Sequence, residues 1–322
     1  MSARWLPAGL HDLAVAHGAV IDAACSASPV GDASRWVDLP ELVVEEPTRP
    51  AEPVPWGDGF VSVDLGPDDA STWESFRAVA TDDRDPESFA TRAQVWRLPV
   101  VPYRRRGSSQ APVTNSPAPS GTVDLRGVTV VDLTSMWAGP LCTELLARAG
   151  AAVLKIEPAS RPDGLRFGDG DDGGGRAPMF IELNRSKDVL DLDLRHCSHG
   201  GELGRILRSA DLVVTSLSNR ALTNLGVDAA TLSEGYPDLR TLAITAFDIG
   251  SPEADWVAYG TGVHAASGLG WTAECPVAPA FSYPDPIAGL LACRTALAQL
   301  SGDAPPHARV SLAEAIRPLA AR

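Results

Sequence analysis

Short apolar runs, separated by segments of helical character, fill the chain from about residue 128 onward. Four runs have strand length: 128–133 (VTVVDL), 151–156 (AAVLKI), 211–215 (DLVVT) and 239–245 (LRTLAIT). The helical segments are 138–149, 203–209 and 287–300. Continuous apolar strands that alternate with helices are typical of a parallel sheet buried on both faces. We therefore predict an α/β fold with a doubly wound, mainly parallel, Rossmann-like sheet, whose ligands lie beyond the carboxyl ends of the strands.

The first third of the chain has a different pattern. Residues 1–30 are rich in alanine and predict helix, whereas prolines and acids over 31–58 predict irregular structure. Residues 59–65 (GFVSVDL) alternate like a strand, and a helix is expected over 73–80. These features predict a smaller N-terminal α+β region over residues 1–104.

A stretch rich in serine, proline and glycine, RRRGSSQAPVTNSPAPSG, then interrupts the apolar pattern. This composition predicts a flexible linker over residues 105–121, followed by one domain over 122–322. Its arginines form either a contact surface or a solvated charge cluster, and we favour the solvated cluster.

Composition excludes several classes of protein. The 322 residues carry a formal charge of −14, so a nucleic-acid partner is not expected. No apolar run is long enough for a membrane span, and the five cysteines form no CxxC pair. We expect a cytoplasmic protein with reduced thiols and no membrane contact. The glycine- and aspartate-rich 168–173 and the HCSH of 196–199 fit neither a dinucleotide fingerprint nor a metal site, so no metal is predicted.

The first predicted strand leads into a turn suited to an anionic ligand. After Thr134 the chain reads SMWAGP, and Pro140 fits the first turn of a helix. The small Ala138 and Gly139 allow a ligand to approach backbone N–H groups at the start of that helix. Any tight turn between a strand and a helix favours such residues, so the motif is weak alone.

From this turn on, the sequence resembles the class III CoA-transferases, the formyl-CoA transferase and carnitine dehydratase group. The resemblance covers residues 126–316 in collinear order. The motifs that carry it are VVDLTSMWAGP at 130–140, NRSK at 184–187, LDLD at 190–193, ASGL at 266–269, DPIAGLLA at 285–292 and VSLAEA at 310–315. It implies coenzyme A or an acyl-CoA as substrate, a carboxylic acid as second substrate, no permanently bound cofactor and a possible homodimer.

The resemblance implies that Asp285 is a covalent nucleophile, which forms an aspartyl anhydride and then an aspartyl-CoA thioester. From the residues alone, Asp285 is a helix N-cap with Pro286 at the first helical position, held ionised by the helix dipole. Both roles remain open. Tyr259 falls where family members place a tyrosine at the thioester site, although a core aromatic is the alternative. His264 is expected to be a packed helical histidine.

The resemblance also implies a pocket for the coenzyme. Its predicted residues are Trp137 and Ala138; Leu192, Asp193, Leu194 and Arg195 at the nucleotide end; Ser216 and Leu217; and Val257, Ala258 and Gly260 at the pantetheine end. Two arginines usual in the family fall at Pro158 and Asn224, so we expect weaker phosphate binding unless Lys155, Lys187 or the linker arginines compensate.

Two functions remain open from the sequence. One is an acyl-CoA:carboxylate CoA-transferase that acts through Asp285. The alternative is a catalytically degenerate CoA-transferase fold that binds a CoA ester or a partner protein. Family members continue past the position of Arg322 with a glycine-rich loop, which favours the alternative. Residues 58–80, with Trp73 in the helix, resemble the family's small domain, and we predict that residues 1–104 are a remnant of it placed ahead of the large domain.

Overall fold

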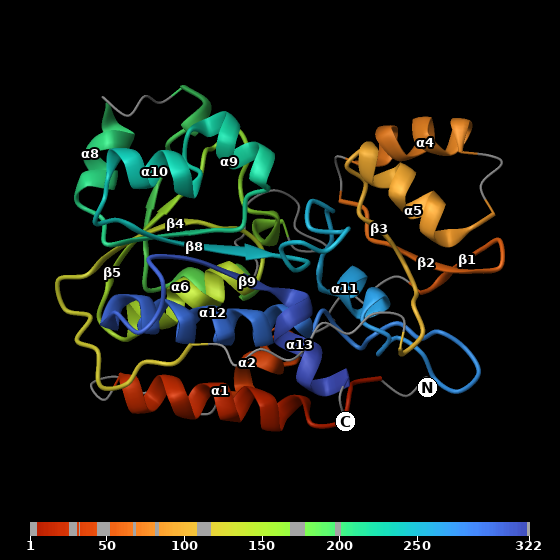
Figure 1. Ribbon diagram of the computed structural model, residues 1–322, viewed down its shortest axis with the longest axis horizontal. Helices are drawn as coiled ribbons and strands as arrows, with labels where there is room; N and C mark the ends of the chain where they lie inside the picture. Colours follow the sequence, from red (N-terminus) through yellow and green to blue (C-terminus); the bar gives the residue numbers. More distant parts are fainter. Residues whose placement is uncertain are drawn as a thin grey trace.

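A six-stranded parallel sheet forms the centre of the protein in the computed structural model (Figure 1). The structure describes residues 5–25, 31, 33–43, 52–66, 69–80, 84–107, 117–167, 178–196 and 201–320. The strand order is β6-β5-β4-β7-β8-β9, and every neighbouring pair is parallel. The strands are β4 (Thr129–Leu133), β5 (Ala152–Ile156), β6 (Asp188–Leu190), β7 (Leu212–Thr215), β8 (Arg240–Thr245) and β9 (His307–Ser311). The predicted doubly wound α/β fold is confirmed, and β4, β5, β7 and β8 each begin one residue later than predicted.

Helices cover both faces of this sheet because alternate side chains of each strand point to opposite sides. Val130 belongs to one apolar cluster, and Val131 belongs to the other. The first cluster takes in α1 (Leu10–Ala24), α6 (Ala138–Arg148), α12 (Pro284–Ser301) and α13 (Leu312–Ala320). The second takes in α8 (Glu202–Arg208), α9 (Asn219–Leu225) and α10 (Ala229–Gly235).

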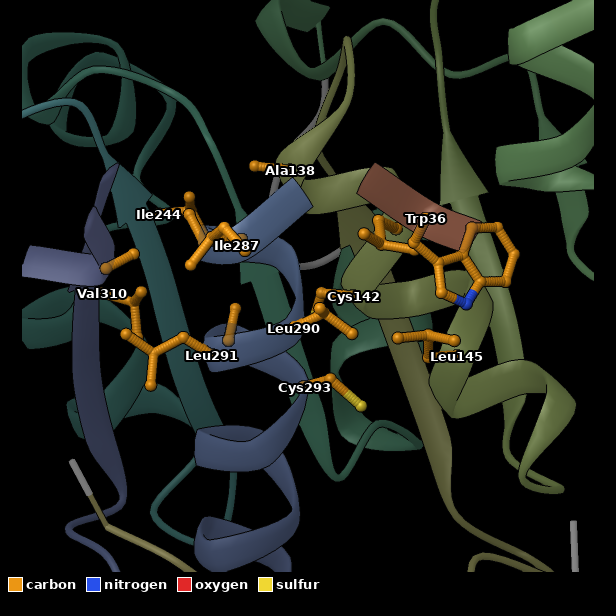
Figure 2. Packing of buried hydrophobic residues seen from close by; sticks show 14 of the residues in the cluster. Trp36, Ala138, Cys142, Leu145, Ile244, Ile287, Leu290, Leu291, Cys293 and Val310 are labelled. Carbon is orange, nitrogen blue, oxygen red and sulfur yellow. The ribbon is translucent and has the colours of Figure 1, made fainter. Parts of the chain in front are cut away.

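Helix α12 is buried around most of its circumference (Figure 2). Its side chains pack against the sheet at Ile244 and Val310 and against α6 at Cys142. The start of α12 approaches α6 so closely that a Cβ at Gly289 would lie 2.7 Å from the Ala138 carbonyl oxygen. A helix that is apolar on all sides needs partners on all sides, which here include α1.

Residues 31–58, predicted to be irregular, instead contain regular elements. These are α2 (Ser34–Val37), α3 (Leu39–Val43) and β1 (Val54–Trp56). Trp36 is fully buried in the same cluster as α12, as Figure 2 shows. Of the prolines that suggested irregular structure, Pro47 and Pro50 lie outside the described residues, whereas Pro55 lies within β1. The short helices have too few turns to show a period.

A second, antiparallel sheet forms a separate layer with its own core. Its strands pair in the order β1-β2-β3, with β2 (Gly59–Val63) in the middle and β3 (Val100–Pro102) beside it. Helices α4 (Ala70–Val79) and α5 (Pro86–Val95) cover it. Phe89 stacks on Trp56 with ring centroids 3.7 Å apart, and Phe76 joins them. We call residues 52–104 the small region; residues 5–43 pack with the parallel sheet instead.

The small region docks on the loop that precedes α11 (Gly260–Ala266). The Gln94 amide accepts from the Val257 N–H at 2.7 Å and donates to the Val257 carbonyl at 2.9 Å. Arg104 pairs with Glu87 and with Glu253, at 2.8 and 2.7 Å. The docking is compatible with the predicted small-domain remnant, which remains a prediction.

The arginine run is solvated in part, since Arg105 and Arg106 are exposed and Arg104 is not. Arg104 is half-buried in its two ion pairs, and Arg105 lies over the ring of Trp271 at 3.9 Å. Aromatic faces and carboxylates that come from distant parts of the chain attract these cations, and no local pattern reveals them. Residues 108–116 of the predicted linker lie outside the described residues.

Membrane spans and metal clusters were searched for in the described ranges only. No helix there is long and apolar enough to cross a bilayer. No group of three histidine, cysteine, aspartate or glutamate side chains there could hold a metal ion. The acidic segment 168–173 and most of 196–199 lie outside those ranges.

Candidate functional site

Asp285 lies in the first turn of α12, but it is not the N-cap that the sequence predicted. The helix begins at Pro284, and Tyr283 occupies the cap position without a side-chain hydrogen bond. Both Pro284 and Pro286 therefore lie in the first turn, where backbone N–H groups have no helical partner and their loss costs little. Asp285 therefore lies inside the helix, and its carboxyl can face other elements.

The carboxyl of Asp285 is enclosed, because the residue is only 9% exposed. The Ser282 hydroxyl donates to its Oδ2 at 2.6 Å. A Cβ at Gly260 would lie 2.2 Å from the same oxygen, so only glycine lets the backbone of α11 pass there. The site is therefore closed tightly on one side by the start of α11.

Burial raises the pKa of Asp285 to about 6; the bond from Ser282 and the nearby Gly260 N–H oppose the rise, and the charge of Asp64 adds to it. Desolvation therefore outweighs the helix dipole that was expected to hold this carboxyl ionised. With a pKa of about 6, most of the population is still ionised at pH 7.

Tyr259 precedes α11 and is half-buried beside the same site. Burial raises the pKa of its phenol, as do the charges of Asp64, Asp69 and Asp285, whereas Arg161 opposes them. The structure thus groups Tyr259, Gly260 and Asp285. Asp64 was not among the predicted site residues, because it follows β2 and lies far from the others along the chain.

His264 is fully buried within α11, so the packed position predicted for it is confirmed. Its ring nitrogens bond to the Tyr283 hydroxyl at 3.1 Å and to the Val277 carbonyl at 2.9 Å. Burial lowers its pKa to about 4. The neutral ring ties α11 to the start of α12.

A second buried carboxyl, Asp132, lies behind the Ala-Gly-Pro turn. Lys187 pairs with it at 3.0 Å, and the hydroxyls of Thr134 and Thr143 donate to it at 2.5 and 2.6 Å. Burial favours the neutral carboxyl, but the ammonium groups of Lys187 and Lys155 hold the pKa of Asp132 below its usual range. This network fastens β4 to α6 and to the NRSK segment.

Lys155 and Lys187, two of the cations that could compensate for the lost arginines, are both engaged inside the protein. Lys155 bonds to the Thr134 carbonyl at 2.7 Å and to Asp163 at 3.1 Å. Lys187 also bonds to the Pro140 carbonyl at 2.9 Å. Both are at most 1% exposed at their side chains.

The other predicted pocket residues follow the carboxyl ends of parallel strands, which share one edge of a sheet. Trp137 and Ala138 follow β4, and both are 6% exposed. Ser216 and Leu217 follow β7, and the Ser216 hydroxyl accepts from the Ser135 N–H at 3.2 Å. Val257 and Ala258 belong to the loop before α11, where Val257 is held by Gln94.

The predicted nucleotide end lies beyond β6. The Arg195 side chain is 64% exposed and pairs with Asp193 at 2.5 Å. Leu192 and Leu194 are half-buried against the second apolar cluster. Within the described residues, no hydrogen bond, ion pair or ring contact links this group to Asp285, so the structure joins them only through the shared edge of the sheet.

The parallel sheet, the Ala-Gly-Pro turn and the enclosed aspartate define an α/β protein of the CoA-transferase type. Residues 125–319 match the model of CoA-transferase family III, and the chain belongs to that family. It is similar to the probable CoA-transferase Rv1866 of Mycobacterium tuberculosis, 30% identical over 220 residues, 62% of this chain and 27% of that protein. It is also similar to a formyl-CoA:oxalate CoA-transferase of Escherichia coli, 32% identical over 148 residues, 46% of this chain and 36% of that protein.

Solved structures show the same fold. Rv3272 from M. tuberculosis superposes with a TM-score of 0.54 at 26% identity, covering 64% of this chain and 58% of that one. A CAIB/BAIF family protein from Brucella suis gives 0.53 at 26% identity, covering 60% and 54%. The chain thus spans between 27% and 36% of the two curated relatives, and a little over half of these two solved chains.

Proposed function

We propose that this protein is an acyl-CoA:carboxylate CoA-transferase with Asp285 as the covalent nucleophile. The observation that carries the proposal is an enclosed carboxyl, 9% exposed, that makes no ion pair with any described lysine or arginine. A carboxylate that is not neutralised by a cation keeps its nucleophilicity. Membership of CoA-transferase family III supplies the substrate class.

The reaction runs through two exchanges at the Asp285 carboxyl. Its oxygen attacks the thioester carbonyl of the donor, the C–S bond breaks, and CoA thiolate leaves behind a mixed anhydride. The thiolate then attacks the aspartyl carbonyl, which releases the donor acid and forms an aspartyl-CoA thioester. The acceptor carboxylate attacks that thioester and expels the thiolate, which forms a second mixed anhydride. The thiolate then attacks the acceptor carbonyl of this anhydride, the C–O bond to the Asp285 oxygen breaks, and the new acyl-CoA leaves the Asp285 carboxylate restored.

The neighbouring groups support these steps. The Ser282 hydroxyl, 2.6 Å from Oδ2, orients the attacking carboxylate. The backbone of Gly260 closes one side of the carboxyl, where a Cβ would lie 2.2 Å from Oδ2. We assign Tyr259 to the thioester site and the coenzyme to the shared edge of the sheet, from Trp137 and Ala138 toward Arg195. Formyl-CoA and oxalate are the substrates named for the E. coli relative; the acids used by this chain are left open.

Covalent trapping tests the proposal. The protein is incubated with acetyl-CoA, succinyl-CoA or formyl-CoA, treated with hydroxylamine or borohydride, and analysed by peptide mass spectrometry. A mass change on Asp285, absent from Asp285→Asn, supports the nucleophile. The matched control is Asp228→Asn, at an exposed helix cap, which should be labelled at Asp285 as the unmodified protein is.

One observation favours the alternative, a CoA-ester-binding protein without turnover. Lys155 and Lys187 are engaged internally, and Arg195 already has a carboxylate partner. If calorimetry detects acyl-CoA binding while no acyl-CoA labels Asp285, the binding protein replaces the enzyme. Cytoplasmic location and a homodimer remain predictions. Sedimentation of the purified chain decides the oligomeric state.

A further inference from the structure

Asp64 follows strand β2 of the small region and reaches the site from outside the residues that match the family. Its backbone N–H donates to the Pro99 carbonyl at 3.2 Å, which fixes the end of the strand. Its carboxylate accepts a hydrogen bond from the Thr261 hydroxyl, in the first turn of α11. The bond joins positions 197 residues apart in the sequence.

Thr261 is 7% exposed and directly follows Gly260. On its other side, the backbone of Gly260 presses against the carboxyl of Asp285 and against Ser282, where a Cβ would approach to 2.2 and 2.4 Å. The Gly260 N–H lies close enough to lower the pKa of Asp285. The peptide of Gly260 and Thr261 is therefore held between two carboxyl groups, one from each layer of the protein.

We propose that Asp64 is a positioning residue for Asp285: through Thr261 it holds the Gly260 backbone against the Asp285 carboxyl. The placement of the backbone stands independently of any reaction, whereas its catalytic consequence rests on the proposed function. In this arrangement the small region completes the site, since the part of the chain that matches the family does not contain Asp64.

Asp64 also acts on Asp285 through its charge. The charge of Asp64 shifts the pKa values of both Asp285 and Tyr259, and the charges of Asp69, Arg161 and Asp285 shift that of Tyr259. The charge of Asp64 raises the pKa of Asp285, and burial raises the pKa of Asp64 itself. Two carboxyls in one enclosed place disfavour simultaneous ionisation, so removal of one charge favours the ionised form of the other.

Three variants separate the hydrogen bond from the charge. Asp64→Asn keeps an oxygen that accepts from Thr261 and removes the charge. Thr261→Val removes the hydrogen bond and keeps the charge. Asp64→Ala removes both. Asp228→Ala is the matched control, because Asp228 makes an equivalent bond to Thr231 at 2.8 Å on the exposed surface of α10.

Hydrogen–deuterium exchange of the peptide that spans 257–266 reads the positioning directly and needs no activity. Loss of one hydrogen bond should speed exchange about two- to tenfold in Thr261→Val and in Asp64→Ala. Asp64→Asn and Asp228→Ala should match the unmodified protein. The double variant Asp64→Ala/Thr261→Val should be no faster than either single variant. Unchanged exchange in both single variants, or additive effects in the double variant, overturns the proposal.

The pH dependence of Asp285 labelling adds a readout that a purely structural role would not move. Asp64→Asn should lower the midpoint of labelling by roughly half to one pH unit, whereas Thr261→Val should lower the plateau rate. An unmoved midpoint in Asp64→Asn overturns the electrostatic coupling. If the unmodified protein is never labelled, the proposed function fails, and the exchange experiment still decides the role of Asp64.

Discussion

Two buried aspartates, Asp132 in β4 and Asp285 in the first turn of α12, have opposite surroundings. Asp132 is 0% exposed and receives bonds from Lys187, Thr134 and Thr143. Asp285 is 9% exposed and, among the described residues, receives a side-chain bond only from the Ser282 hydroxyl. The pKa of Asp132 is held below its usual range, whereas that of Asp285 is raised to about 6.

The difference separates a carboxylate whose charge is compensated from one whose charge is not. Ammonium groups compensate the burial of Asp132, and its lone pairs are occupied, so it is inert and binds three segments together. Asp285 retains part of the desolvation cost of its charge in the folded protein. Such a cost is typical of functional sites, where an ionisable group lacks the ion pairs and hydrogen bonds that would compensate its burial.

The largest expected effect comes from removing the cation beside Asp132. Lys187→Met leaves a buried carboxylate with one close cation fewer and should lower the free energy of unfolding by about 3–5 kcal/mol. Urea denaturation at pH 7.5 measures it. Arg126→Gln, which breaks the exposed pair with Asp124 at 2.6 Å, is the control and should change nothing measurable. Equal stability of the two variants would remove the basis of the comparison.

The same substitution at the two aspartates should have opposite signs. Asp132→Asn removes a charge that its lysines need and destabilises the fold. Asp285→Asn removes an uncompensated buried charge and should raise the free energy of unfolding by about 1–3 kcal/mol at pH 8. Denaturation of both variants at several pH values measures the two effects.

The sign of the pH dependence follows from the raised pKa of Asp285. The pKa of this carboxyl is about 6 in the folded protein, against an ordinary value of 3.8. Between those two pH values the folded protein therefore binds more protons than the unfolded chain. This group therefore disfavours folding most above pH 6, and its penalty is lost as the pH falls toward 4. The advantage of Asp285→Asn should shrink over the same range; an advantage that persists at pH 4 would contradict this origin.

The smallest expected effect comes from the one hydroxyl that bonds to Asp285. Ser282→Ala removes a donor to the ionised carboxyl and should raise the pKa of Asp285 further, by about half to one unit. The pH at which the destabilisation by this group reaches its full value, near the folded pKa, should therefore move upward by the same amount. Ser301→Ala, at an exposed bond to Asp303, serves as the control. A downward move would mean that Ser282 does not stabilise the charged form.

The centre of the parallel sheet was predictable because β4, β7 and β8 are largely buried and therefore read as apolar runs, whereas the edge strands β6 and β9 carry exposed residues. The short helices α2 and α3 were not predictable, since a single turn carries no period and their burial depends on contacts with α12. The end of α12 followed the pattern more closely than its start. Two prolines in three residues permit a helix to begin at either one.

The proposed nucleophile was identified from family motifs, but its surroundings were not. Asp285 and Tyr259 lie within recognisable segments, whereas Asp64 lies in the small region and comes close only through tertiary packing. The fate of the lysines was hidden for the same reason. The sequence does not reveal a partner for Lys155 or Lys187. The fold shows that Lys155 pairs with Asp163 and that Lys187 pairs with Asp132.

The burial of α12 also determines how much of the chain must fold together. Helix α1 and Trp36 lie outside residues 125–319, yet they belong to the apolar cluster around α12. A shortened protein cut at the borders of the family match would expose that surface to water and would tend to aggregate. The evolutionary unit and the cooperative folding unit of this chain therefore have different borders.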